Sequence, residues 1–285
     1  MKKQKRQQLS ANLLDQPNRT LSFIEMSGKV VRTLAATTQE HTKRLHKKFG
    51  PNILSVLKNY DIYEILGRGS YGVVVKMCKQ GTNQCFAAKI SKTNRREFEL
   101  EYIIQEKVYF ETGLTLRPAH RPVYFSDGNK TYGILLMELI YGDMMVLSDF
   151  LERKLSLTTL KYIFNQLIFL IDQMDKYKII HGDMHFSNIL IKDNTQLLLF
   201  DFGLASFGVS NRKLDFLQLI RTTFPKYNKN KPVLLYNLRV LRSFLLKAVY
   251  KEFRIAPKTH YLSEKFWDEE MTVYMKSDVF RRLRI

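Results

Sequence analysis

The pattern of apolar and polar positions separates an N-terminal extension from a longer folded domain. Residues 1–20 are polar and basic, which predicts a mobile tail. Over 28–49, apolar side chains recur at helical spacing among lysines and arginines, which predicts a basic amphipathic helix that a Gly-Pro dipeptide then ends. We therefore expect a partly helical extension over 1–57 and one domain over 58–285.

The first half of the domain has the short apolar runs and turn residues that are typical of β-strands. Three runs precede one helical segment with an apolar stripe, and two more follow it. The strands are expected at 62–66, 73–77, 85–90, 122–126 and 132–140, and the helix at 96–112. This half is therefore predicted to be a β-rich lobe over 58–142.

The second half changes to the spacing of buried helices. A long amphipathic helix is expected over 156–177, followed by two short strands at 189–191 and 196–200. The remainder, from Arg212, has mainly helical spacing. The fold class predicted is α+β, with two lobes, of which the α-rich one covers 143–285.

A glycine-rich turn lies between the first two expected strands. Its sequence is Leu66-Gly67-Arg68-Gly69-Ser70-Tyr71-Gly72. Glycine lets backbone amides approach phosphate oxygens, because no Cβ stands in the way. β-branched residues follow the turn, which favours a strand–loop–strand arrangement over the strand–loop–helix of dinucleotide-binding folds. Taken alone, the motif also fits an ordinary glycine-rich hairpin.

Lys89 lies between apolar neighbours on the third expected strand, where burying a charge is costly unless the charge is used. Triphosphate oxygens would use it, and an acidic partner would hold it in place. The helix that follows offers Glu97, Glu99, Glu101 and Glu106. Helical spacing places Glu101 at the edge of the buried face, so we expect it to be the partner, with Glu99 and then Glu106 as alternatives.

Three polar residues follow expected strands in the second lobe. Asp183 and Asn188 lie in the segment His181-Gly-Asp-Met-His-Phe-Ser-Asn188, and Asp201 begins an Asp-Phe-Gly tripeptide. Phosphoryl transfer needs a carboxylate to orient a hydroxyl and accept its proton, and it needs oxygen ligands for Mg²⁺. An isolated Asp-Phe-Gly is only a turn tripeptide, but these residues are expected to converge on one cleft.

These motifs occur in one order, each on the element that its role requires, and the sequence resembles the eukaryotic-type protein kinase family over 61–203. The resemblance implies a serine/threonine protein kinase that uses ATP and Mg²⁺. It makes Asp183 the catalytic aspartate and places Lys89 on the α- and β-phosphates. Asn188 and Asp201 would bind Mg²⁺.

The resemblance also assigns the nucleotide site. The glycine-rich turn, residues 66–72, would cover ATP, and the strand that enters the hinge would contact adenine. Met137 would be the gatekeeper, Glu138 and Ile140 would present backbone groups to adenine, and Asp143 would reach the ribose. Val74 and Ala87 complete the expected nucleotide contacts, and Glu101 supports them through Lys89.

Departures from the family pattern change the expected regulation. Gly182 stands where regulated kinases carry the arginine that pairs with an activation-loop phosphate. His185 stands where a lysine beside the γ-phosphate is usual, and we expect it to be a catalytic residue with Asp183 and Lys89. No Ala-Pro-Glu follows Asp201, so a usual activation segment is not expected. Asp215 resembles the aspartate that braces the catalytic loop, although an acidic residue in the first turn of a helix needs no such role.

Several alternatives to a protein kinase stay open. Gly182, His185 and the short segment also resemble small-molecule kinases of the aminoglycoside and choline type. A pseudokinase-like basic binding module is a further alternative. The shortened second lobe resembles Ser/Thr kinases of large DNA viruses, the poxvirus second kinase type among them. That likeness predicts a viral protein in the host cytoplasm and in the virion.

The net charge of +19 lies in the flanks of the chain. Residues 1–60 hold 12 basic and 3 acidic side chains and residues 204–250 hold 9 and 1, whereas residues 61–203 hold 17 of each. Basic surfaces attract acidic proteins, nucleic acids and anionic lipids, and they also serve solubility alone. We expect protein substrates, acidic ones among them, with nucleic acid or an anionic membrane surface as partners of the flanks.

The remaining composition indicates an intracellular globular protein. Hydrophobic residues make up 45% of the chain, enough for a sizeable core. No apolar run reaches the roughly 18 residues of a membrane span, and no signal peptide is evident. The two cysteines, Cys78 and Cys85, are expected to be reduced thiols.

Overall fold

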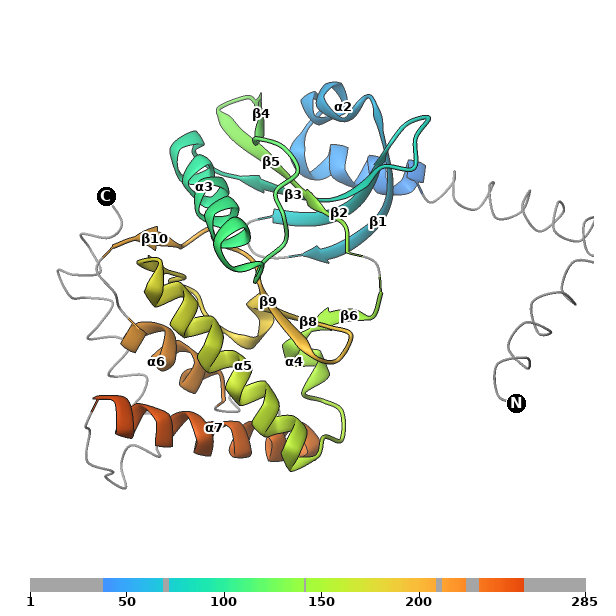
Figure 1. The fold of residues 1–285 in the computed structure, drawn as a ribbon. Helices are drawn as coiled ribbons and strands as arrows, with labels where there is room; N and C mark the ends of the chain where they lie inside the picture. The colour runs from blue at the N-terminus through green and yellow to red at the C-terminus, as the bar shows by residue number, and fades with distance from the viewer. Residues whose placement is uncertain (1–37, 69–71, 141, 209–211, 224–230, 254–285) are drawn as a thin grey trace, which may run out of the picture.

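The computed structural model describes residues 38–68, 72–140, 142–208, 212–223 and 231–253. Figure 1 shows two lobes, with a sheet and helix α3 in one and mainly helices in the other. The expected α+β class and its division into a β-rich and an α-rich lobe are confirmed. Within these residues, no helix has the length and apolar character needed to span a membrane. The tail expected at 1–20 lies outside them.

The N-lobe is built on a five-stranded antiparallel sheet. The strand order is β1-β2-β3-β5-β4, so β4 forms one edge. The bounds are β1 Tyr60–Arg68, β2 Gly72–Lys79, β3 Cys85–Lys92, β4 Val123–Asp127 and β5 Lys130–Glu138. Gly72 has to be glycine, because a Cβ there would lie 2.4 Å from the carbonyl oxygen of Ile90 on the next strand.

Helix α3, Arg95–Thr112, lies against one face of this sheet (Figure 1). Asn94 caps its first turn by accepting a hydrogen bond from the Glu97 amide, and Gly113 ends it with a left-handed φ of 67°. Phe98 packs so closely on the sheet that a Cβ on Gly133 would lie 2.4 Å from its ring. The strands and α3 lie where the sequence predicts them, within two residues.

The other face of the sheet is covered by two helices from the segment assigned to the extension. Residues 38–49 are helical, and α2 covers Asn52–Leu57. Four apolar side chains of this pair, Leu45, Phe49, Ile53 and Leu57, are buried in one cluster with the sheet. Of the helix expected over 28–49, residues 38–49 are helical, and the first half lies outside the described residues. The helical half forms part of the N-lobe core.

Cys78 and Cys85 form a disulfide in the structure, so the expectation of reduced thiols is wrong. The two residues face each other in the register of β2 and β3, with Cα atoms 4.0 Å apart. The sequence separation of seven residues gave no sign of this pairing, since it depends on where the turn of the hairpin falls.

The C-lobe packs around helix α5, Leu157–Lys176. Ser156 caps it by accepting from the Thr159 amide, and its buried stripe includes Leu160, Leu167 and Met174, as predicted. The other elements are β6 Met144–Val146, α4 Leu147–Phe150, β7 Ile179–Ile180, β8 Ile189–Lys192, β9 Gln196–Leu199, β10 Ser206–Phe207, α6 Arg212–Thr222 and α7 Pro232–Phe253. Elements as short as β6 and β10 have too few residues to show a periodicity, and they were not predicted.

The chain passes quickly from Asp201 to helix α6. Phe202 is buried in the C-lobe core, and β10 then pairs with β7 in an antiparallel two-stranded sheet. Gly208 donates its amide to the carbonyl of Lys178. Within the described residues, the segment that leads to α6 is therefore fastened to the strand before the catalytic loop.

Candidate active site

A half-buried lysine joins the two lobes. The Lys89 ammonium on β3 lies 2.5 Å from Glu101 Oε1 on α3 and 2.7 Å from Asp201 Oδ1, which follows β9. Asp201 takes a left-handed φ of 61°, unusual for a residue with a side chain. Glu101, the partner expected from the sequence, is therefore the glutamate that contacts Lys89.

The three charges have different environments. Burial favours the neutral form of Lys89, but Glu101 and Asp201 outweigh it, so the pKa of the lysine is raised. Burial raises the pKa of Glu101, and Lys89 opposes this. Burial would also raise the pKa of Asp201, yet Lys89 lowers it below the ordinary value. With all three ionised, the cluster carries a net charge of −1.

The two alternative partners of Lys89 have other roles. Glu99 accepts a hydrogen bond from the Tyr124 hydroxyl at 2.9 Å, and Glu106 accepts one from Tyr102 at 2.5 Å. Sequence reasoning missed Gln105, which is buried and donates to the Leu116 carbonyl at 2.9 Å. The contact of Glu99 with Tyr124 on β4 joins α3 to the sheet, and Gln105 ties α3 to the segment that follows it, so Glu101 is held facing Lys89.

The catalytic loop surrounds the Asp183 carboxylate. Asn188 donates its side-chain amide to the Asp183 carbonyl at 3.0 Å and to Oδ2 at 3.1 Å. His185 Nε2 lies 3.3 Å from the same Oδ2. Burial would raise the pKa of Asp183, but the contacts with His185 and Asn188 lower it, so the carboxylate is ionised at neutral pH. Such a group can orient a hydroxyl and accept its proton.

His181 is a structural residue at the base of this loop. It is fully buried, and burial lowers its pKa to about 4. Its Nδ1 accepts the Asp183 amide at 3.4 Å, so its Nε2 carries the proton and donates to the Phe200 carbonyl at 3.1 Å. His181 thereby links the loop that carries Asp183 to the strand that leads to Asp201.

Side chains of helix α6 contact the backbone of the catalytic loop. Backbone hydrogen bonds from His181 and Gly182 favour the ionised form of Asp215, although burial raises its pKa to about 7. One turn further, Gln218 donates to the Gly182 carbonyl at 2.6 Å and accepts the Met184 amide at 2.8 Å. Gln218 therefore holds both peptide groups next to Asp183. The sequence signal that was missed is the spacing of Asp215 and Gln218, which puts both on one helix face.

Gly182 fits this arrangement only as glycine. Its φ is +76°, and a Cβ would lie 2.3 Å from the carbonyl oxygen of Leu204. The loop thus approaches the segment after Asp201 too closely for a side chain. This close approach explains why position 182 carries glycine, where the family pattern has arginine.

We predict that Gln218→Ala lowers kcat about tenfold and changes KM for ATP less than twofold. The variant loses two hydrogen bonds of about 1 kcal/mol each that position Asp183 and do not touch nucleotide residues. Steady-state kinetics measure both constants. Gln166→Ala is the matched control, because the Gln166 side chain donates its hydrogen bond to the exposed Tyr162 on the same helix, α5. An unchanged kcat, or a parallel loss in ATP affinity, would contradict the positioning role.

The expected adenine-site residues gather between the lobes. Ala87 and Met137 face each other across β3 and β5, and both are buried in one cluster. Val74 and Ile140 pack against that cluster. Leu190 and Leu198, which sequence reasoning missed, belong to it as well. Residues of both lobes therefore contribute to this apolar cluster.

The other expected nucleotide residues within the described ranges lie at the ends of β1, β2 and β5 and just after β5. Leu66, Gly67 and Arg68 end β1 and Gly72 begins β2, whereas Gly69, Ser70 and Tyr71 lie outside the described residues. Glu138 ends β5 and donates its backbone amide to the Arg117 carbonyl. Asp143 is exposed, and among the described residues no hydrogen bond or ion pair joins its carboxylate to the rest of the site.

The donors at the site fit a hard divalent cation. The Asn188 amide nitrogen is used by Asp183, so its side-chain oxygen is left for another ligand. Lys89 donates to one carboxylate oxygen of Asp201, Oδ1, so the second oxygen, Oδ2, could bind a cation. Amide and carboxylate oxygens beside a cluster of net charge −1 suit Mg²⁺ better than softer metals.

Comparisons with known proteins agree with this geometry. Residues 60–224 match the family model described as protein kinase domain. NUAK family SNF1-like kinase 1 of Mus musculus is 26% identical over 167 residues, which cover 58% of this chain and 24% of that protein. Homeodomain-interacting protein kinase 2 of Mesocricetus auratus is 30% identical over 165 residues, or 54% and 14% of the two chains. Mitogen-activated protein kinase 2 of Pneumocystis carinii is 29% identical over 161 residues, or 55% and 45%.

The matched region spans less than half the length of each of these relatives. The family match itself covers more than half of this chain and runs from β1 to the residues just after α6. It includes Lys89, Glu101, Asp183, Asn188 and Asp201. The chain therefore belongs to the protein kinase domain family.

Proposed function

We propose that this protein is a serine/threonine protein kinase that transfers the γ-phosphoryl group of ATP to hydroxyls of protein substrates. The observation that carries the proposal is the ion-paired cluster of Lys89, Glu101 and Asp201. Lys89 and its helix glutamate must be in place for phosphoryl transfer in this family. A pseudokinase would not need to keep this cluster together with an ionised Asp183.

In this proposal, the residues act by positioning and charge. Asp183 receives the hydroxyl proton of the substrate while Asn188 and His185 hold its carboxylate. Lys89 binds the α- and β-phosphates, and the apolar cluster around Ala87 and Met137 holds adenine. Asn188 and Asp201 would hold Mg²⁺, which supplies charge neutralisation between the phosphates. Most of the rate acceleration then comes from orientation and electrostatics.

A small-molecule kinase is the second candidate, favoured by His185. This histidine contacts Asp183 itself, where a longer lysine would reach a phosphate. A shorter side chain leaves room beside the catalytic carboxylate for a compact substrate. The relatives named above are protein kinases, which favours a protein substrate. The basic residues over 204–250 favour an acidic one.

In this proposal, the enzyme is active without phosphorylation of an activation segment. Gly182 offers no cation to such a phosphate, and Gln218 and Asp215 brace the loop instead. Three hydroxyls near α6 are already used or buried: Ser206 is buried, and Thr222 and Thr223 donate to carbonyls within the helix end. The catalytic loop is thereby held in place by permanent contacts.

We also propose a viral type, a location and further partners for this kinase. The short connection to α6 supports a kinase of the type found in large DNA viruses, acting in the cytoplasm of a host cell and packaged in the virion. The basic flanks support an additional contact with nucleic acid or an anionic membrane surface.

The test is transfer of label from γ-labelled ATP in the presence of Mg²⁺. Phosphatase-treated protein made in bacteria is expected to label casein, an acidic protein, more than protamine, and to label serine and threonine. Aminoglycosides and choline should accept no label. Transfer to a metabolite alone would favour the second candidate, and no transfer to either panel would contradict the proposed activity.

A further inference from the structure

A pocket of about 710 Å³ lies on the N-lobe, lined by the end of β3, the start of α3 and the β4–β5 hairpin. None of the residues assigned to the active site lines it. Its lining includes three cations, Lys92, Arg95 and Lys130, and no acidic side chain. Hydroxyls of Ser126 and Thr131, which face each other in the register of β4 and β5, add hydrogen-bonding groups.

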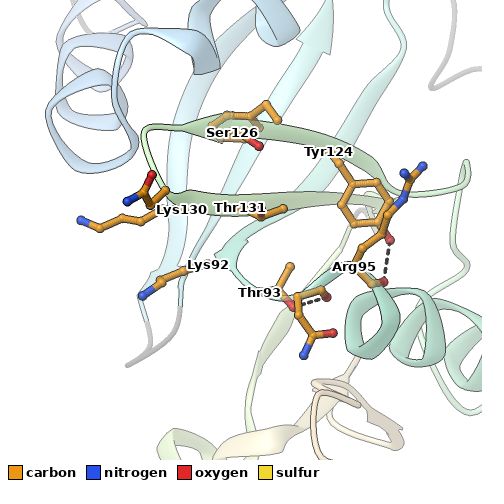
Figure 2. Close-up of a pocket in the computed structure, with 10 residues that line it drawn as sticks. Lys92, Thr93, Arg95, Tyr124, Ser126, Lys130 and Thr131 are labelled. Atoms are coloured by element: carbon orange, nitrogen blue, oxygen red, sulfur yellow. Dashed lines mark hydrogen bonds between the residues drawn. The ribbon is translucent and has the colours of Figure 1, made fainter.

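Figure 2 shows how the cations are distributed around the pocket. Lys92 and Lys130 extend on the same side of the hairpin, and Arg95 lies at the other end beside Tyr124. The Arg95 guanidinium sits 5.0 Å from the centre of the Tyr124 ring. Tyr124 is held in turn by its hydrogen bond to Glu99. One cationic end is therefore fixed in advance, and the other is formed by two exposed lysines.

These cations have no compensating partner in the part of the chain that the structure describes. No ion pair joins Lys92, Arg95 or Lys130 to a carboxylate there. Glu99, one turn further along α3, accepts its hydrogen bond from the Tyr124 hydroxyl. The N-terminus of α3, an 18-residue helix, opens at the same place and adds positive potential. The pocket therefore favours an anion.

We propose that this pocket binds a phosphate group carried by a peptide, as phosphoserine or phosphothreonine. Charge-assisted hydrogen bonds from lysine and arginine suit a phosphate dianion. The volume is in the range of small-ligand pockets and admits a phosphorylated side chain with its neighbours.

A polynucleotide fits these observations less well. Single strands are bound along grooves with a row of cations and with aromatic rings that are free for stacking. Here the cations surround one pocket, Arg95 covers the Tyr124 ring, and Phe125 is buried in a stack with Tyr132 at 5.2 Å. The site is thus a docking site for a phosphorylated protein partner. It lies apart from Asp183 and does not depend on the proposed catalytic activity.

The test measures binding by fluorescence anisotropy with the full chain carrying Asp183→Asn, so that turnover plays no part. The probe is a fluorescein-labelled nonapeptide of glycine, alanine and one central phosphothreonine. The same peptide with threonine and a single-stranded 12-nucleotide DNA serve as comparison probes. We expect the phosphopeptide to bind at least about tenfold more tightly than its unphosphorylated form.

Two matched double variants locate the binding. Lys92→Gln with Lys130→Gln should weaken phosphopeptide binding about tenfold or more. Lys154→Gln with Lys161→Gln removes the same charge from the exposed C-lobe surface and should change it less than twofold. Equal losses in both pairs, no preference for the phosphopeptide, or loss of DNA binding equal to that of the phosphopeptide would each overturn the proposal. Thermal melting of each variant verifies that it is folded.

Discussion

Asp183→Asn is expected to lower kcat by about a thousandfold or more while ATP binding changes little. Loss of a catalytic group that acts as part of a unit has effects of this size. The asparagine side chain keeps the shape of the aspartate and can still accept the amide of Asn188, but it cannot accept a proton from a hydroxyl. Single-turnover label transfer measures the chemical step, and nucleotide titration measures binding.

Asp149→Asn on α4 is the control for this substitution. It makes the same chemical change at an exposed carboxylate that accepts a long hydrogen bond, 3.5 Å, from the Ser148 hydroxyl. We expect its rate to stay within twofold of the parent. If Asp183→Asn kept more than a tenth of the parent rate, Asp183 would not be the group that accepts the proton.

Much of the fold could be predicted because its elements are long enough to show a period. Helix α5 repeats its apolar side chains over five turns. The strands of the N-lobe are short apolar runs that are separated by turn residues. The pairing of Lys89 with Glu101 was also predictable, since helical spacing puts Glu101 at the boundary of the buried face. Glu99 and Glu106, two residues before and five residues after Glu101, contact tyrosines instead.

The features that were missed depend on contacts between distant segments. Gln218 has an ordinary place in the sequence of α6, and only the approach of the catalytic loop gives it two peptide groups to bind. Cys78 and Cys85 become neighbours because the β2–β3 hairpin sets their register. The basic pocket likewise combines Lys92 with Lys130 across two strands. No local pattern along the chain contains such information.

The pair formed by Lys89 and Glu101 gives the second large expected effect. Lys89→Met should lower kcat/KM about a thousandfold, because the variant loses a phosphate ligand and leaves two carboxylates without their cation. Glu101→Gln should lower it about a hundredfold, since Asp201 still holds the lysine but its position becomes less defined. Glu99→Gln and Glu106→Gln are the matched controls and should stay within a few fold.

Thermal unfolding separates this catalytic effect from a loss of structure. Lys89→Met leaves Glu101, which is 4% exposed, as a buried charge beside Asp201, so we expect a lower melting temperature. Glu101→Gln removes that buried charge and keeps the shape of the side chain, so its melting temperature should stay close to that of the parent. The two variants should therefore lose activity together and differ in stability. Equal, mild losses of activity for all three glutamate variants would show that Glu101 has no special part in holding Lys89.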